Sequence, residues 1–159
     1  MKHRQESVCL LLLALALGAV LPLSAEAPSP FDFTATNLDG TAFSGRSLAG
    51  KAVLLDFWGT WCAPCIHAFP KLRQLHADFG DRLTVVGMAF YSGELEDVAA
   101  AAAEHELDYT VLMGAEETLG QFEIFAFPSY VMISADGEIL FTQAGQMADL
   151  YERVAAYFP

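Results

Sequence analysis

Residues 55–65 read LDFWGTWCAPC, and this segment decides the fold. It belongs to an apolar run over residues 52–58, which is typical of a strand covered on both faces. Two cysteines, Cys62 and Cys65, follow after a short turn. Beyond them, apolar residues recur with helical spacing as far as Gly80, a residue type that often ends helices. The segment therefore predicts a buried strand, a turn, and a helix whose first turn holds both cysteines.

The rest of the chain alternates strand and helix patterns. An alternating stretch at 31–36, the turn signal at 37–40 and a return arm at 41–43 predict a hairpin. The further predicted elements are a strand at 83–90, a helix to about His105, a strand at 109–113, a helix at 116–122, a hairpin of strands at 130–134 and 139–142, and a helix at 147–158. This order predicts an α/β fold, a mixed central sheet flanked by helices, with an N-terminal β-hairpin extension. We expect the 52–58 strand at its centre and Ser92 as the cap of the helix after the 83–90 strand.

The amino-terminal residues 1–25 differ from the remainder. Basic residues precede an apolar run at 8–21, and small residues follow it. This order is typical of a secretory signal peptide, and the run is shorter than the ~18 apolar residues of a spanning helix. We expect residues 1–25 to be a signal peptide or an N-terminal membrane anchor and residues 26–159 to form one domain. Cys9 precedes the apolar run and is expected to have no later role.

The composition indicates an acidic globular domain. The 159 residues are 54% hydrophobic and carry a formal net charge of −12. Removing residues 1–25 removes two cations and one acid, which gives −12 − 1 = −13. Such a charge disfavours binding to nucleic acid or to anionic lipid headgroups. We therefore expect no nucleic-acid partner; the acidity keeps the domain soluble or, as the alternative, helps to select partners.

The two remaining cysteines indicate redox chemistry. Disulfides persist in the oxidising compartments that exported proteins reach, but Cys62 and Cys65 would close a very small ring, which constrains the unfolded chain little. Amide groups at a helix start favour an anion there and should lower the pKa of the Cys62 thiol. Cys65 lies one turn on, where it can displace a partner from Cys62. We predict Cys62 as the nucleophile and Cys65 as the resolving thiol, with Ala63 and Pro64 forming a stiff, uncharged connection.

Asp56 interrupts the apolar strand. A carboxylate buried without a partner is costly, so its pKa should rise. A carboxyl that titrates nearer neutrality can move protons for Cys65, and we interpret Asp56 as a catalytic proton-transfer group. The alternative is that local twist or a water channel exposes Asp56 harmlessly.

These motifs resemble those of thioredoxin-like proteins of the TlpA/ResA/CcmG type. The matching features are the Trp-Cys-x-Pro-Cys string at 61–65, Pro70, and the Phe-Pro-Ser segment at 127–129, and the resemblance extends from about residue 31 to 159. It implies a thioredoxin fold over residues 26–159. It also implies that Pro128 follows a cis peptide bond facing the cysteines. Substrate contacts are then expected from Trp61, Ala63, Pro64, Phe127 and Pro128, with the Phe127 backbone pairing an extended substrate segment.

The sequence also departs from this family. The ResA-like branch often carries a glutamate where this chain has Ala68, which puts a dedicated role as an apocytochrome-c reductase in doubt. TlpA-like proteins often carry asparagine at the position of Asp56, whereas thioredoxins carry aspartate. His67 is interpreted as a surface residue, with an electrostatic partner of the site as the alternative, and His76 and His105 are interpreted as helix-surface residues.

The resemblance implies a thiol–disulfide oxidoreductase. The amino-terminal segment predicts that it is periplasmic or otherwise exported, either soluble or anchored by that segment. We expect a monomer without a cofactor. We expect it to reduce protein disulfides, with electrons from a membrane thiol-reducing donor. A disulfide oxidant or isomerase is the alternative, because direction depends on reduction potential. A copper carrier is a further alternative, since two thiolates can bind Cu(I), although we expect no resident metal.

Overall fold

The computed structural model describes residues 29–159, and the predicted signal or anchor segment, with Cys9, lies outside them. The strands are β1 Thr34–Asn37, β2 Ala42–Ser44, β3 Ala52–Trp58, β4 Leu83–Ala89, β5 Thr110–Gly114, β6 Ser129–Ile133 and β7 Ile139–Ala144. The helices are the 3-10 turn η1 Gly45–Leu48, α2 Ala63–Phe79, α3 Leu95–Glu104, α4 Glu116–Gln121 and α5 Leu150–Ala155. Within this range, no helix is long and apolar enough to cross a bilayer.

Seven strands form one mixed sheet in the order β2-β1-β5-β4-β3-β6-β7. The strands β3, β4 and β5 are parallel, and β1, β2, β6 and β7 run antiparallel to their neighbours. The mixed sheet and the amino-terminal hairpin confirm the predicted fold class. The prediction that β3 is the middle strand is wrong: the hairpin extends the sheet beyond β5, so that β4 becomes the fourth of seven. All residues of β3 are nevertheless buried.

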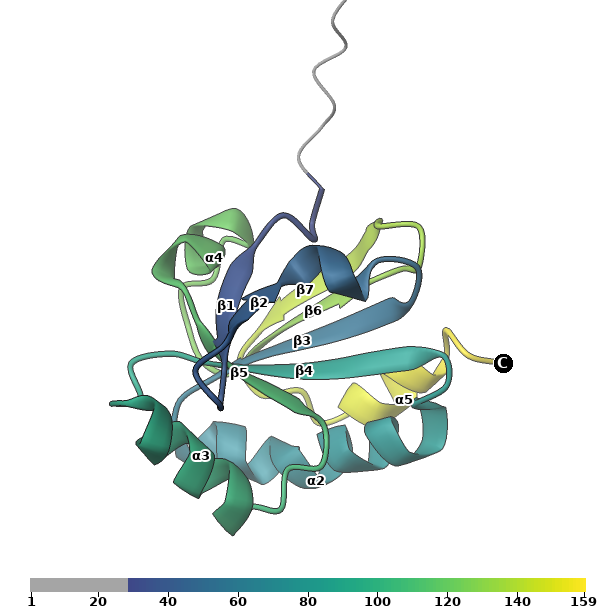
Figure 1. Ribbon diagram of the computed structural model, residues 1–159. Coiled ribbons are helices and arrows are strands. Elements are labelled where there is room, and N and C mark those ends of the chain that lie inside the picture. The colour runs from purple at the N-terminus through teal and green to yellow at the C-terminus, as the bar shows by residue number, and fades with distance from the viewer. Residues whose placement is uncertain (1–28) are drawn as a thin grey trace, which may run out of the picture.

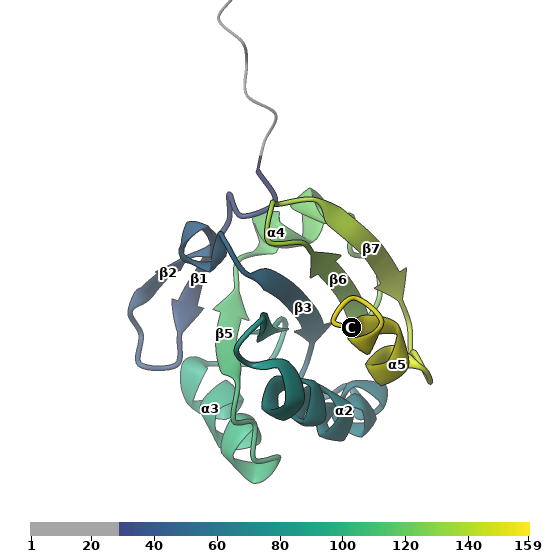
Figure 2. The same ribbon diagram turned by 90° about the vertical axis from the view of Figure 1, so that its right-hand side faces the viewer.

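Helices cover both faces of the sheet (Figures 1 and 2), with α2, α3 and α5 on one face and α4 and η1 on the other. Alternate residues of β3 divide between two cores. Leu54 and Trp58 join the core under α2, whereas Leu55 and Phe57 join the core beneath α4. Because Asp56 falls between Leu54 and Trp58 in this alternation, its side chain faces the α2 core.

Two local predictions about helix ends need correction. Glu94, not Ser92, caps α3, through a capping box in which Asp97 Oδ2 accepts from the Glu94 N–H at 2.9 Å. Ser92 lies two residues before this cap position, and its hydroxyl oxygen accepts instead from the Thr60 N–H. The final helix spans only Leu150–Ala155, shorter than the predicted 147–158.

Candidate active site

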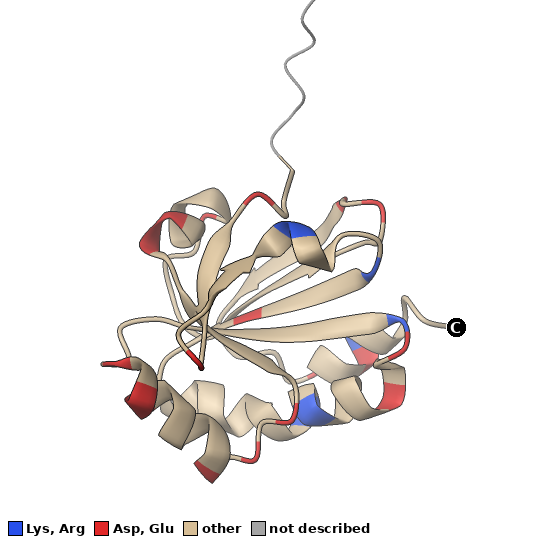
Figure 3. Ribbon diagram, in the orientation of Figure 1, with Lys and Arg blue, Asp and Glu red and all other residues tan. Residues whose placement is uncertain are grey.

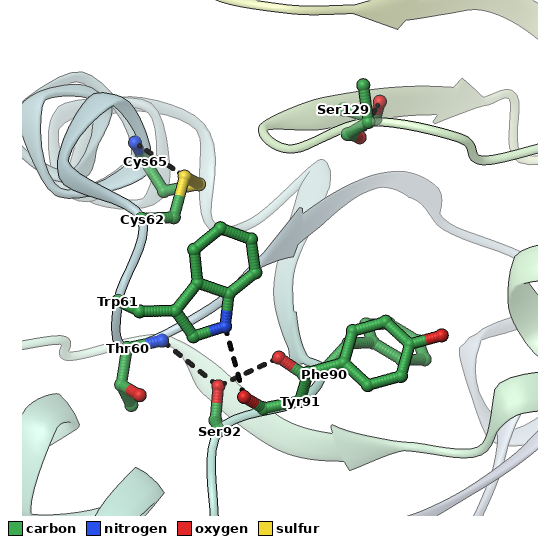
Figure 4. Close-up of a disulfide and its surroundings, with 9 residues drawn as sticks. Thr60, Trp61, Cys62, Cys65, Phe90, Tyr91, Ser92 and Ser129 are labelled. Atoms are coloured by element: carbon green, nitrogen blue, oxygen red, sulfur yellow. Dashed lines mark hydrogen bonds between the residues drawn. A yellow bond between two sulfur atoms is a disulfide. The ribbon is translucent and has the colours of Figure 1, made fainter.

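The two cysteines form a disulfide at the start of α2 (Figure 4), with sulfur atoms 2.07 Å apart. Cys62 is the N-cap residue, and the Cys65 N–H points at its sulfur at a nitrogen–sulfur distance of 3.3 Å. Cys62 is 3% exposed and Cys65 is fully buried, so a partner molecule reaches the Cys62 sulfur more easily. Ala63 and Pro64, between them, are exposed and form the first residues of the helix.

Asp56 lies in the middle of β3 and is fully buried. Neither of its carboxylate oxygens has a hydrogen-bond partner within residues 29–159. Loss of hydration raises the pKa of Asp56 to about 8, because burial penalises the ionised form. This agrees with the raised pKa expected from sequence, and no exposing twist is present. The carboxyl can therefore change protonation state near neutral pH.

The peptide bond between Phe127 and Pro128 is cis, as the resemblance implied. It immediately precedes β6, which begins at Ser129, so the Phe127 backbone lies just outside the sheet. The Ser129 hydroxyl donates to the Ala126 carbonyl at 2.7 Å and ties this turn together. The Gly145 N–H donates to the Pro128 carbonyl at 2.8 Å. The Phe127 side chain packs against both cores.

An exposed aromatic cluster borders the disulfide turn. Trp61 and Tyr91 are 59% and 61% exposed, and the Trp61 indole N–H donates to the Tyr91 carbonyl at 3.0 Å (Figure 4). The Phe127 ring lies edge-on to Trp61 at 5.8 Å and to Tyr91 at 6.3 Å between centroids. We refer to Trp61, Tyr91 and Phe127 as the aromatic rim. It brings an apolar, partly exposed surface beside Cys62.

A hydrogen-bonded link joins the disulfide turn to the loop after β4. The Thr60 N–H donates to the Ser92 hydroxyl oxygen at 3.0 Å, and the Ser92 hydroxyl donates to the Phe90 carbonyl at 2.9 Å (Figure 4). Ser92 is buried, so both bonds are protected from water. The link fixes the position of the Trp61 turn relative to Tyr91.

The charge at this edge of the sheet comes from the neighbouring helices. Residues 59–66 carry no charged side chain. Acidic residues lie instead in the first turns of α3 and α4, which follow the parallel strands β4 and β5 (Figure 3). The disulfide therefore lies in an uncharged turn next to an acidic border.

Comparison with known proteins identifies the family. The Redoxin family model matches residues 23–156. The chain belongs to the Redoxin family. The soluble secreted antigen MPT53 of Mycobacterium tuberculosis is 31% identical over 157 residues, 91% of this chain and 90% of that protein. The thiol-disulfide oxidoreductase ResA of Bacillus cereus is 27% identical over 122 residues, 76% of this chain and 68% of that protein.

A solved structure supports the same assignment. A secreted M. tuberculosis disulfide oxidoreductase, described as homologous to E. coli DsbE, has a TM-score of 0.71 and 31% identity. The similarity covers 80% of this chain and 97% of that one. Together these matches show that this Redoxin-family chain has a thioredoxin fold and is a thiol–disulfide oxidoreductase of the TlpA/ResA/CcmG type.

The structure of this Redoxin-family protein brings together Trp61, the two cysteines and Phe127, all named from sequence. Tyr91 and Ser92 were missed as site residues. Their signal was their position: they come two and three residues after the buried parallel strand β4, at the edge where such sheets hold their sites.

The remaining residues around the site of this Redoxin-family chain differ in how far they are buried. Trp58 is buried against Phe69, with ring centroids 5.1 Å apart, and Ala68 is buried as well. His67 is exposed as predicted. His76 and His105 are half-buried rather than on the open surface, because their rings pack against aromatic neighbours. No group of three metal-ligating side chains that could hold an ion occurs within residues 29–159.

Proposed function

We propose that this oxidoreductase reduces disulfides in exported proteins by dithiol–disulfide exchange through Cys62 and Cys65. The observation that carries the proposal is the cysteine pair at the start of α2, with Cys62 the less buried sulfur and the aromatic rim beside it. The N–H groups of the first helical turn favour a thiolate at Cys62, since they place partial positive charge at the helix start. A thiolate is the attacking species in disulfide exchange.

The reaction has two exchange steps. The Cys62 thiolate attacks one sulfur of the substrate disulfide; a Cys62–substrate disulfide forms, and the second substrate sulfur leaves as a thiolate that takes up a proton. The Cys65 thiol then loses its proton to the Asp56 carboxylate and attacks the Cys62 sulfur. The remaining substrate sulfur leaves as a thiolate and takes up a proton from the solvent. The substrate gains two electrons and two protons, and the Cys62–Cys65 disulfide forms.

Regeneration requires a dithiol reductant. We assign the role of this reductant to a membrane thiol-reducing donor, which would reduce the Cys62–Cys65 disulfide by the reverse exchange. The carboxyl of Asp56 would then return its proton to the Cys65 thiolate, because the same group serves both directions of the exchange.

Substrate binding is assigned to the surface around the less buried sulfur. Trp61 and Phe127 would receive apolar side chains, while the exposed Ala63 and Pro64 would line the approach to Cys62. The Phe127 backbone lies next to the cis bond to Pro128 and outside the sheet, so it would pair with an extended segment. A disulfide in a poorly folded chain offers such a segment.

We place the protein in the periplasm or another exported compartment. The proposal is supported by the basic–apolar–small order of residues 1–25 and by the secreted antigen MPT53, which aligns with most of the chain. Residues 1–25 would be removed or would anchor the domain, and residues 26–159 would form the working monomer.

The test combines activity with trapping. In an insulin reduction assay with a dithiol reductant, Cys62→Ser should abolish activity. Cys65→Ser should instead accumulate mixed disulfides with exported proteins, because the second exchange step is lost. Equal insulin reduction by wild type and Cys62→Ser would refute the assignment. The substitution Ala77→Ser, at an exposed position of the same helix away from the substrate surface, serves as the control.

Direction is tested by equilibrium with glutathione. A reductase should have a reduction potential near or below about −200 mV, whereas a strong oxidant lies near about −120 mV. A potential at the upper end would overturn the reductase assignment in favour of an oxidant.

A further inference from the structure

Phe125 is the most exposed large hydrophobic residue among residues 29–159, with 92% of its surface open to solvent. The residues just before it point inward: Phe122 and Ile124 are buried and join the core beneath α4. A single exposed apolar side chain is common, but an exposed aromatic next to a binding surface marks an interaction site. Phe125 takes no part in the exchange steps or in the substrate contacts proposed above.

The backbone before Phe125 is fixed by the end of α4. The Glu123 N–H donates to the Gly120 carbonyl at 3.3 Å, and the Ile124 N–H donates to the Leu119 carbonyl at 2.8 Å. These two bonds form a Schellman motif, in which the residue at positive φ is usually glycine. Here that residue is Glu123, with a φ of 54°. Left-handed backbone is strained for a residue with a Cβ, and such strain is concentrated at functional sites.

The backbone after Phe125 is fixed by the turn at the cis bond. The Ser129 hydroxyl donates to the Ala126 carbonyl at 2.7 Å, and β6 begins at Ser129. The Phe125 side chain therefore cannot turn into the core unless the Schellman motif or this turn is broken. A segment that is already ordered loses little conformational entropy when a partner binds, so Phe125 is presented ready for contact.

Phe125 lies close to the aromatic rim. Two trans peptide units separate it from Phe127, so their Cα atoms are at most ~7.6 Å apart. The Phe127 ring in turn contacts those of Trp61 and Tyr91. Trp61, Tyr91 and Phe125 are 59%, 61% and 92% exposed, so at ~150–250 Å² for a whole aromatic side chain they present roughly 300–500 Å² of surface. An apolar patch of this size on a monomer is often functional.

Charge and position favour a substrate segment as the occupant of this patch. The net charge of −12 opposes pairing of two copies, because like charges repel. Glu116 and Glu117, in the helix that leads to Phe125, disfavour anionic lipid headgroups. The patch is instead continuous with the aromatic rim beside Cys62, which a substrate disulfide has to approach.

We propose that Phe125 is a specificity-determining residue that selects disulfides flanked by large apolar side chains, as unfolded chains expose them. The inference rests on the proposed function, in which an extended substrate segment pairs with the Phe127 backbone. Because an extended chain advances about 3.3 Å per residue, a substrate residue two positions from that pairing lies beside Phe125. Apolar surface buried there stabilises the bound substrate and leaves the exchange at Cys62 unchanged, so the effect falls on the KM.

The test compares two disulfide-linked peptides that differ only in the residues flanking the cysteine, which are leucine in one and serine in the other. We expect the wild type to prefer the leucine peptide about tenfold in kcat/KM. Phe125→Ala should lose most of this preference through a higher KM at unchanged kcat, whereas Phe125→Leu should keep it. Ile139→Ala is the matched control, because Ile139 is 46% exposed and pairs with Ile133, at the end of β6 away from the cis bond.

The outcomes separate this inference from the proposed function. Reduction of both peptides by the wild type no faster than by Cys62→Ser would overturn the proposed function. Equal kcat/KM for the two peptides in the wild type, or an undiminished preference in Phe125→Ala, would overturn the role of Phe125 alone. Sedimentation that shows dimers of the wild type but not of Phe125→Ala would assign Phe125 to a second copy and overturn it too. Binding to phosphatidylglycerol vesicles that is lost in Phe125→Ala would do the same in favour of a lipid surface.

Discussion

Replacing Asp56 with asparagine should make the protein more stable, and increasingly so as the pH rises. Asp56 is fully buried in β3, and neither of its oxygens has a hydrogen-bond partner among the described residues. Asparagine has nearly the same shape but cannot ionise. The substitution therefore removes the cost of a buried charge and leaves the packing of the α2 core almost unchanged.

The size and sign follow from the shifted pKa. Burial raises the pKa of Asp56 from 3.8 to about 8. Between these values the folded protein binds one more proton than the unfolded chain, so the free energy of unfolding falls as the pH rises. Each pH unit is worth about 1.4 kcal/mol, which gives about 6 kcal/mol over the whole window and about 4 kcal/mol between pH 5 and pH 8. Below pH 3.8 the contribution is fully regained.

Urea unfolding of the oxidised wild type and Asp56→Asn at pH 5, 6, 7, 8 and 9 measures this difference directly. All other titrating groups are common to both proteins, so they cancel in the comparison. The exposed substitution Asp136→Asn is the control and should follow the wild type at every pH. Parallel stability curves for wild type and Asp56→Asn would refute the claim that a buried, unpaired carboxyl ionises in this window.

Two further predictions concern the surface around the disulfide. Ser92→Ala should lower the free energy of unfolding by about 1–3 kcal/mol, since it leaves the partly buried Thr60 N–H without its acceptor and removes a donor to the Phe90 carbonyl. Chemical denaturation measures this change, and wild-type stability in the variant would contradict the link. Trp61→Ala should change the free energy of unfolding by less than about 0.5 kcal/mol because the side chain is exposed, but it should raise the KM for a disulfide-containing peptide. An unchanged KM in steady-state kinetics would exclude Trp61, and with it the Trp61–Phe127 contact, from substrate binding.

The parts of the fold that follow from local pattern were predictable. The β3 prediction matches the observed strand residue for residue, because its seven successive buried positions are apolar except for Asp56. The helix carrying Cys65 was equally clear, since its apolar positions repeat with helical spacing. The cis bond before Pro128 came from family resemblance rather than from any local pattern.

What could not be predicted depends on contacts between distant residues. The place of β4 in the middle of the sheet is set by pairing of the hairpin with β5, which no local pattern encodes. Serine often caps helices, yet the Ser92 hydroxyl accepts a hydrogen bond from Thr60 in the disulfide turn, 32 residues away in sequence. Tyr130 has the pattern of an ordinary strand residue, and only the strand register shows that it is directly opposite Asp56.

The destabilisation that Asp56 causes and its proposed role in proton transfer both follow from the burial of its carboxyl. An aspartate on the surface would keep a pKa near 4 and, at neutral pH, would be permanently ionised and a poor acceptor for a thiol proton. Burial in β3 raises the pKa of Asp56 to about 8, where the carboxyl can both take and return a proton, but it also destabilises the fold. Stability and exchange rate should therefore change in opposite directions: Asp56→Asn gains stability and resolves mixed disulfides more slowly. A variant at Asp56 that gained stability with no loss of rate would show that the buried acid does not serve the exchange.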